Sequence, residues 1–475
     1  MKPARLRAAL LATLLLGGCT TVGRDYVVPD QAKVRLPAAR RAFANADGAA
    51  VNPDPVPDNW WRLFDDPALD RLERDALSAN ADLRVAAANL ARAEAVESEA
   101  DTAGRPRLQA SAAAARSQLS AESYLLPTRL PQMNLADAGA AVSYQIDLFG
   151  KLRRAAEAAK ADAEATSAAL DVARVSVVAD VARAYVAACS AGYELAAAKH
   201  ALDVQEQSLA ATERLAAAGR GTPIDTARGR SLVDQSRAAI PAFEARRRAA
   251  LYKLAVLTGE PPAAFPPVVA TCSALPRVSQ PIPVGDGASL LRRRPDIRQA
   301  ERMLAAATAR IGVATAALYP SIGIGLGGGS TGLLTDLGEP AANYWSVGAL
   351  ISWSMPDGRE RARIMQADAV AAAALARFDG IVLNALRETE TSLAAYTQDL
   401  RRNAELRAAR DEAAEAQQQI ERLYRAGRSP YLTALDSRRT LAAAEAALAA
   451  SESQISDDQV TLFLVLGGGW AAKAG

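Results

Sequence analysis

Histidine and cysteine are scarce in this 475-residue chain, which has one histidine, His200, and three cysteines. So few of these side chains cannot supply a histidine-based catalytic triad or a multi-ligand Cys/His zinc site. Lys and Arg number 55 against 53 Asp and Glu, so the formal net charge at pH 7 is only +2. A nucleic-acid binder would need a clear cationic excess. We therefore expect no enzymatic activity, no metal, no cofactor other than a covalent lipid, and no nucleic-acid partner.

The first 18 residues have the pattern of a signal peptide. Basic residues precede the apolar run Ala8–Leu16, which is too short to span a bilayer as a permanent helix. The run is followed by Gly17-Gly18-Cys19, which resembles the cleavage box of bacterial lipoproteins. We predict removal of residues 1–18 and lipidation of Cys19, and a plain signal peptide followed by a chance cysteine is the alternative. By the same resemblance, Thr20 rather than aspartate after the lipidated residue favours sorting to the outer membrane.

Residues 19–59 contain five prolines and show no helical period, so we predict an extended arm after the lipid anchor. The two remaining cysteines, Cys189 and Cys272, are far apart in the sequence. Cys189 lies in an alanine-rich helical pattern and is predicted to be a small buried apolar residue.

The rest of the chain is a tandem duplication. Two motifs of the first half recur in the second half at the same spacing, Gly150-Lys151 as Gly358-Arg359 and Glu213-Arg214-Leu215 as Glu421-Arg422-Leu423. Self-similarity at a fixed offset is typical of repeat architectures. We assign 60–258 and 292–470 to the two repeats, 259–291 to a proline-rich equatorial linker, and 471–475 to a short tail.

Each repeat is predicted to contain a helix, a strand pair, a long helix, a tip turn and a further helix. The opening helix of the first repeat is expected over 67–103, capped by Asp66. The long helices, at about 150–218 and 359–426, contain no proline. At 1.5 Å per residue each would extend about 100 Å, so they must pack side by side rather than inside a globule. A cytosolic coiled-coil rod is the alternative, and the strands make it the weaker one.

The strands are predicted at about 107–118, 138–149, 320–330 and 344–355. In the last of them Trp345, Val347, Ala349, Ile351 and Trp353 alternate with small or polar residues over a length that spans a bilayer as a tilted strand. A soluble sheet with one buried face would give the same alternation. Four strands are too few to close a barrel, and lipid tolerates no open sheet edge. Three chains would supply about twelve strands around a water-filled lumen, so we expect a homotrimer.

Four motifs resemble the outer-membrane efflux protein family of TolC-like channels, specifically the NodT-type lipoprotein branch that works with RND transporters. They are Trp60-Trp61-Arg62-Leu63-Phe64-Asp65-Asp66-Pro67, Tyr144-Gln145-Ile146-Asp147-Leu148-Phe149-Gly150, Arg292-Arg293-Arg294-Pro295-Asp296-Ile297 and Leu466-Gly467-Gly468-Gly469-Trp470. The resemblance implies a mainly α fold with β: a trimeric twelve-stranded outer-membrane barrel continued by a periplasmic α-helical barrel. It also implies docking on a periplasmic adaptor and an inner-membrane RND pump.

The resemblance assigns roles to the turns that join the long helices to their successors. Five residues are expected at the periplasmic tips that meet the adaptor: Gly219, Arg220, Gly221, Gly427 and Ser429. Four are expected to close the tube just beyond the tips: Asp225, Tyr424, Arg428 and Asp436. For the two aspartates the alternative is helix-terminal capping. The runs Arg246-Arg247-Arg248 and Arg292-Arg293-Arg294 are interpreted as solvated helix faces or ends rather than anion sites.

The expected function is a passive duct in the bacterial outer membrane, lipid-anchored, with helices projecting into the periplasm. It would export drugs or other small molecules for a tripartite RND efflux system. Two alternatives stay open: an outer-membrane component of a type I secretion system, and a lipid-anchored periplasmic coiled coil without a pore.

Overall fold

The computed structural model describes residues 21–46, 48–353, 355 and 358–469, which fall into two compact units. The first unit combines the described residues up to Pro29 with Leu90–Thr166 and Ala300–Phe378. The second combines Asp30–Asn89, Ser167–Gln299 and the chain from Asp379 onward. Each unit thus draws segments from both sequence repeats, so equivalent elements of the duplication pack together.

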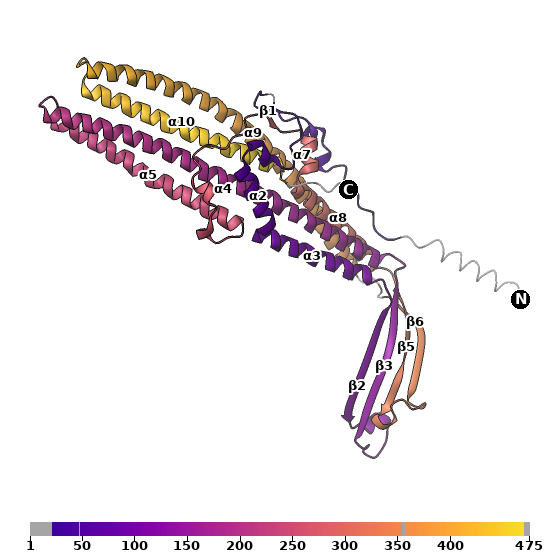
Figure 1. The fold of residues 1–475 in the computed structure, drawn as a ribbon. Coiled ribbons are helices and arrows are strands. Elements are labelled where there is room, and N and C mark those ends of the chain that lie inside the picture. The colour runs from indigo at the N-terminus through magenta and orange to yellow at the C-terminus, as the bar shows by residue number, and fades with distance from the viewer. Residues whose placement is uncertain (1–20, 47, 354, 356–357, 470–475) are drawn as a thin grey trace. The chain divides into compact units, whose positions relative to one another are not determined.

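The first unit carries a four-stranded sheet in the order β2-β3-β5-β6 (Figure 1). Its strands are β2 (Arg107–Ser117), β3 (Met133–Ile146), β5 (Ser321–Leu333) and β6 (Asn343–Ser352). Every neighbouring pair is antiparallel, and β3 pairs β5 along twelve consecutive positions from Leu135↔Leu333 to Ile146↔Ile322. The strand pairs of the two repeats therefore form one continuous sheet.

The strand β3 differs most from its expected range of 138–149. It begins at Met133, where it pairs Ser117 of β2, and ends at Ile146. Asp147 cannot continue the strand because its carboxylate accepts hydrogen bonds from the backbone N–H groups of Leu152 (3.0 Å) and Arg153 (2.9 Å) at the start of the next helix. The alternation of apolar residues runs past this helix-capping residue, which is why the pattern placed the strand end three residues late.

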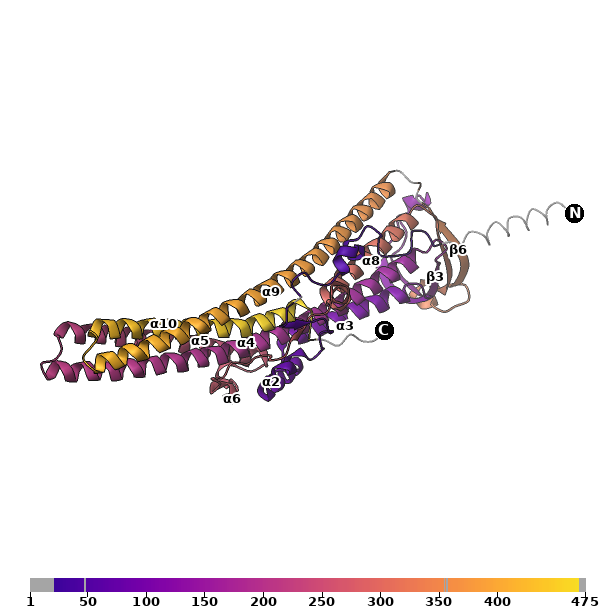
Figure 2. The ribbon, with the colours of Figure 1, turned by 90° about the horizontal axis from the view of Figure 1, so that it is seen from above.

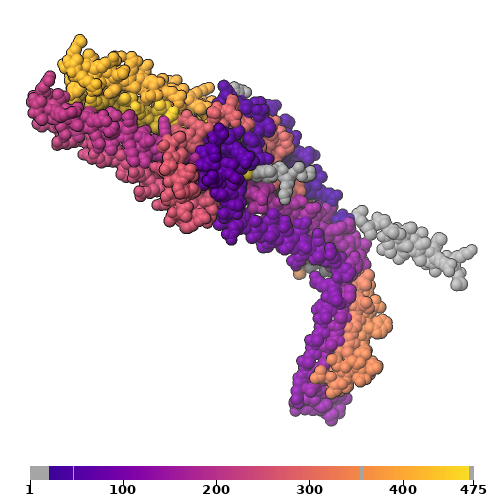
Figure 3. Space-filling model, in the orientation of Figure 1, coloured from indigo at the N-terminus to yellow at the C-terminus, as the bar shows by residue number. Residues whose placement is uncertain are grey.

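The sheet exposes large apolar side chains instead of burying them. Trp345, Val347 and Ile351 on β6 are 79%, 65% and 67% exposed, and Leu108 on β2 is 71% exposed. On the face drawn in Figure 3, no helix of the first unit covers the strands. A soluble sheet would bury one face in a core, so the exposed apolar side chains favour a membrane environment over the soluble alternative.

Two helical hairpins follow the strand pairs. The first consists of α4 (Lys151–Ala217) and α5 (Pro223–Leu257), and the second of α9 (Arg359–Arg425) and α10 (Tyr431–Val465). In the second unit the hairpins run side by side in both views (Figures 1 and 2). The helices α4 and α9 have 67 residues each, as the duplication requires, and lie within a residue or two of the predicted ranges.

The predicted single opening helix over 67–103 is wrong, because the structure has two helices there. They are α2 (Pro67–Ala79) and α3 (Ala81–Thr102), separated by Asn80, whose φ of −58° and ψ of 132° are not helical. The Asn80 side chain accepts from the N–H groups of Asp82 (2.9 Å) and Leu83 (3.2 Å) and so caps α3. Asparagine competes with the helix backbone in this way, and an apolar pattern that continues on both sides conceals the break. The predicted cap at Asp66 is confirmed.

The core of the second unit is built around Trp60, which is fully buried. Its ring stacks on Phe463 of α10 at 4.7 Å between centroids, and Trp61 and Phe64 make edge contacts with it. Trp60–Phe64 form a short 3-10 helix, and α7 (Gly287–Arg293) and α8 (Pro295–Ala316) follow the linker between the repeats.

The N-terminal arm is less extended than the prolines predict. It contains 3-10 turns at Lys33–Arg35 and Pro37–Arg40, and the short strand β1 (Val51–Asn52) pairs in parallel with β4 (Ile282–Pro283) of the linker. Ala32, Phe43 and Val56 of the arm are buried. The arm is therefore held at intervals. Its backbone also donates from Lys33 to Asp379 (2.7 Å) and from Ala44 to Glu390 (2.8 Å) on α9.

We expect Asn80→Ala to lower the free energy of unfolding by about 1–2 kcal/mol, since it removes the cap of α3 and a hydrogen bond from its amide to the carbonyl of Leu257 (3.0 Å). Urea unfolding of the detergent-purified protein, followed by circular dichroism, measures the change. Asn384→Ala, at an exposed position within α9, is the matched control. An equal effect of the two substitutions would contradict the cap.

Candidate functional site

The turns at the ends of the two hairpins have the same backbone conformation. Gly219 and Gly427 take φ values of +70° and +72°, which favour glycine. In each turn the next N–H returns to a carbonyl five residues earlier, Arg220 to Leu215 at 2.9 Å and Arg428 to Leu423 at 2.8 Å. This is the Schellman pattern that ends a helix by satisfying its last carbonyls. The predicted tips are therefore tight, equivalent turns.

Asp225 caps the helix that follows the first turn. The Thr222 hydroxyl accepts from the Asp225 N–H (3.2 Å), and the Asp225 carboxylate accepts from the Thr222 N–H (3.1 Å) and hydroxyl (2.7 Å). This is a complete capping box. The capping interpretation of Asp225 is thus confirmed, and its assignment to the gate remains a prediction.

The structure gathers part of the predicted tip and gate set around one cavity of about 500 Å³. Its lining includes Gly219, Arg220, Gly221, Asp225, Tyr424 and Ser429. Gly427 lines a neighbouring cavity of about 880 Å³ between the two hairpins. Arg428 and Asp436 are exposed and line neither cavity. The tip turns of the two hairpins are therefore brought together, while Arg428 and Asp436 face solvent in this chain.

Tyr424 is the most enclosed of the predicted gate residues. Its ring lies 5.8 Å from that of Tyr431, at 54°. Burial, and then the neighbouring Tyr431 hydroxyl, raise the pKa of Tyr424 above its ordinary value. The phenol therefore stays neutral, and its ring packs against that of Tyr431.

Arg438, which the sequence interpretation missed, links the two hairpins. Its guanidinium donates to the Glu421 carboxylate at 2.5 Å and to the Ser208 hydroxyl, so one side chain on α10 joins α9 and α4. The side chains of Arg438 and Glu421 are 9% and 17% exposed.

The sequence duplication provides a pattern from which the Arg438–Glu421 pair can be predicted. In the first hairpin Arg230 pairs with Glu213 at 2.7 Å, and both residues lie 208 positions before Arg438 and Glu421 (438 − 230 and 421 − 213). Arg230 and Glu213 are 64% and 42% exposed. Each hairpin is thus closed by the same ion pair, but only the second pair is buried.

The Arg292–Arg294 run is not a solvated helix end, so that interpretation is wrong for two of its residues. The Arg294 side chain is 13% exposed and donates to Asp296, to Glu388 and to the carbonyl of Val465. Arg293 is 18% exposed and donates to the carbonyls of Gly467 and Val56. Both guanidinium groups are held by carboxylates and by backbone carbonyls that local helix bonds leave free, which the spacing of a basic run does not reveal.

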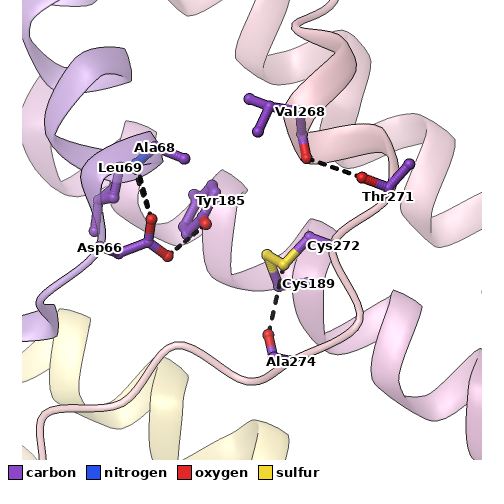
Figure 4. The surroundings of a disulfide bond; sticks show 9 residues. All are labelled: Asp66, Ala68, Leu69, Tyr185, Cys189, Val268, Thr271, Cys272 and Ala274. Atoms are coloured by element: carbon purple, nitrogen blue, oxygen red, sulfur yellow. Dashed lines mark hydrogen bonds between the residues drawn. A yellow bond between two sulfur atoms is a disulfide. The ribbon is translucent and has the colours of Figure 1, made fainter.

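Cys189 is fully buried as expected, but it is not an isolated apolar residue, because it forms a disulfide with Cys272 (Figure 4). Their separation of 83 positions concealed this pairing from the sequence. Disulfides persist in oxidising compartments, which agrees with the predicted export. Cys19 lies outside the described residues. In the described part of the chain no group of three or more His, Cys, Asp or Glu side chains is arranged to hold a metal ion.

A family model described as outer membrane efflux protein matches residues 72–260 and 288–468. The chain belongs to the outer membrane efflux protein family. Nodulation protein T of Rhizobium leguminosarum bv. trifolii is 29% identical over 471 residues, which cover 98% of this chain and 97% of that protein. Outer membrane protein OprJ of Pseudomonas aeruginosa is 31% identical over 485 residues, covering 99% and 97%.

A solved structure of the outer-membrane channel OprN is 34% identical, with a TM-score of 0.87, and covers 95% of this chain and 100% of that one. These findings confirm the resemblance drawn from the four motifs. This outer membrane efflux protein is a channel component of the bacterial outer membrane with its helical hairpins in the periplasm. The matches to the family model and to solved channels favour a channel over both coiled-coil alternatives, the cytosolic rod and the lipid-anchored periplasmic protein without a pore.

We expect Arg438→Ala to lower the free energy of unfolding by about 2 kcal/mol, because it leaves a mostly buried Glu421 with fewer partners. The matched control is Arg230→Ala, which breaks the equivalent exposed pair and should cost less than about 1 kcal/mol. Urea unfolding of the detergent-purified proteins compares the two. Equal losses would show that burial does not distinguish the pairs.

Proposed function

We propose that three copies of the chain assemble into a duct through which small molecules leave the periplasm. The observation that carries the proposal is the sheet: four strands whose outer edges on β2 and β6 have no partner strand within the described chain, with large apolar side chains exposed. Because unpaired backbone groups are not tolerated in lipid, the edges must pair between subunits. Three chains give about twelve strands, enough for an aqueous lumen.

The long helices support the same assembly. An 18-residue stretch of α9 is as apolar as a membrane helix, yet only 22% of it is buried inside the chain. The helices α4 and α9 continue from the strands β3 and β6, so a closed ring of strands would be followed by a ring of helices. Neighbouring subunits would then cover the apolar stretch and form the wall of the duct.

Lipidation of Cys19 would place an anchor beside the sheet. Thr21, two residues further along the chain, lies against Gly150, the residue before α4, where an added Cβ would come within 2.3 Å of the Thr21 Cγ2. Arg154 holds the following residues by donating to the carbonyls of Val22 (3.1 Å) and Gly23 (2.9 Å). The arm therefore starts at the junction between β3 and α4, where the membrane boundary would lie.

The tips would dock on a periplasmic adaptor of an inner-membrane RND pump, with Gly219, Arg220, Gly221, Gly427 and Ser429 at the contact. Several relatives are named as outer membrane proteins of toluene or solvent efflux pumps. Small organic compounds are accordingly the proposed cargo. A type I secretion partner is the second candidate, and the adaptor that co-purifies with the channel distinguishes the two.

Asp225, Tyr424, Arg428 and Asp436 would form the periplasmic gate. The cavity lined by both Asp225 and Tyr424 supports this role, because it lies where the tip turns of the two hairpins meet. Rings of three Asp436 carboxylates would make the neck selective for cations and sensitive to salt.

We expect the double substitution Tyr424→Ala with Arg428→Ala to raise single-channel conductance in planar bilayers, since these are the two residues proposed to hold the second hairpin closed in the trimer. Arg402→Ala, an exposed position within α9, should leave conductance unchanged. The mass of the same detergent-purified sample should correspond to three chains. Unchanged conductance in the double variant would contradict the assignment of the gate. A dimer that conducts would contradict the proposed trimer.

A further inference from the structure

The segment between the two repeats, residues 259–286, crosses the helices of the second unit as a strap. Seven of its residues are prolines, and its regular structure is limited to a 3-10 turn (Pro262–Ala264), the four-residue helix α6 (Pro267–Ala270) and the two-residue β4. So few internal backbone hydrogen bonds cannot fix its conformation. The position of the strap therefore depends on where it is fastened to the helices.

The strap is fastened to the helices by several contacts. Arg277 donates to the carbonyl of Glu452 on α10 (3.2 Å), and the Phe265 ring lies 6.2 Å from that of Tyr252 on α5. Gln459 of α10 accepts from the N–H of Val278 and donates to its carbonyl, both at 3.0 Å. Further on, β4 pairs with β1 of the N-terminal arm. A further attachment is the disulfide from Cys272 to Cys189 of α4 (Figure 4), which joins the first half of the strap covalently to that helix.

Gly192 makes the disulfide possible. It lies one turn after Cys189 on α4, and a Cβ at this position would come within 2.0 Å of the carbonyl oxygen of Cys272. Only glycine lets the strap backbone approach α4 this closely. The absence of a side chain at Gly192 thus leaves room on α4 for the backbone of the strap, whether or not the two cysteines are oxidised. We call this position the seat of the strap.

The two cysteines differ in exposure. Cys189 is fully buried beneath the strap, whereas Cys272 is half-buried. Cys272 is therefore the residue nearer to an external oxidant. Tyr185, one turn before Cys189, donates to Asp66 at 2.5 Å and so holds this part of α4 against the start of α2 (Figure 4).

We propose that Cys189 and Cys272 form a thiol-oxidation site that locks the strap onto α4 after export, and that exchange begins at Cys272. The Cys272 thiolate attacks one sulfur of an oxidant disulfide, forming a mixed disulfide and releasing the other sulfur as a thiolate. The Cys189 thiolate then attacks the Cys272 sulfur, closing the protein disulfide and releasing the second oxidant sulfur. The two cysteine protons are lost to solvent or to the released thiolates, and the oxidant, a protein or small-molecule disulfide, takes up two electrons.

Oxidation of the strap cysteines does not depend on the proposed gate or on assembly of the trimer. It assigns a modification to two residues of an otherwise cysteine-poor chain. It also gives oxidation a structural consequence, because the far end of the strap holds the arm through β1.

The first test measures the lock in the full-length protein purified from outer membranes with free thiols blocked at lysis. We expect no blocked thiol at Cys189 or Cys272 in the wild-type protein by peptide mass analysis. Trypsin should cut after Arg277, which lies in the strap and is one-third exposed, about tenfold faster in Cys189→Ser/Cys272→Ser than in wild type. Free thiols in wild type, or equal cleavage rates, would overturn the proposal.

Gly192→Ala tests the seat without touching either thiol. It should leave a large fraction of both cysteines reduced and speed cleavage at Arg277. Gly380→Ala is the matched control, since an added Cβ at this helical glycine meets no atom within 4 Å in the chain, and it should remain fully oxidised. Full oxidation and unchanged cleavage in Gly192→Ala would show that the seat has no role.

The order of exchange is tested on reduced, purified single variants treated with oxidised glutathione. Cys189→Ser should accumulate a glutathione adduct on Cys272, because the residue that resolves it is missing. Cys272→Ser should give an adduct on Cys189 at least tenfold more slowly. Equal or faster modification of Cys189 would overturn the assignment of Cys272 as the first site.

Discussion

The backbone N–H and carbonyl groups along the outer edges of β2 and β6 impose the constraint on which the rest of the structure depends. Four antiparallel strands satisfy one another internally, but their edges have no partner strand in the described chain. In water such an edge could be covered by charge or by solvent, whereas in a bilayer it must pair with another strand. The apolar residues of β6 indicate a bilayer. Shared closure with other subunits follows from this.

Because of the duplication, the pairing of the strands also determines how the long helices are arranged in the periplasm. Each repeat continues a strand pair into a 67-residue helix, and each helix ends in the same glycine turn. The pairs Glu213–Arg230 and Glu421–Arg438 close the two hairpins at equivalent positions, but burial makes the second a link between hairpins and leaves the first at the surface. The two equivalent ion pairs thus have different structural roles because their surroundings differ.

The second unit is held together by attachments between segments that are distant in the sequence. Arg294 reaches Glu388 and the carbonyl of Val465, Gln459 holds the strap through Val278, and Trp60 stacks on Phe463. Most of these join the repeat boundary or the N-terminal region to the last helix. They fix the parts of the chain that have little regular structure, and the disulfide adds the one covalent attachment.

The sequence by itself determined the repeat, the strands, the long helices and the tip turns, because these depend on local periodicity, on glycine and proline, and on spacing that recurs. It also determined the family, through four motifs in order. It could not show the break at Asn80 or the early end of β3, because a capping side chain competes locally with an apolar pattern that continues past it. Only the tertiary structure decided that Cys189 meets Cys272, that Arg293 and Arg294 are mostly buried and held by carboxylates and carbonyls, and that Arg438 rather than Arg230 joins two hairpins. Those outcomes depend on which distant surfaces come into contact, and a linear pattern carries no information on burial between segments 83 or more residues apart.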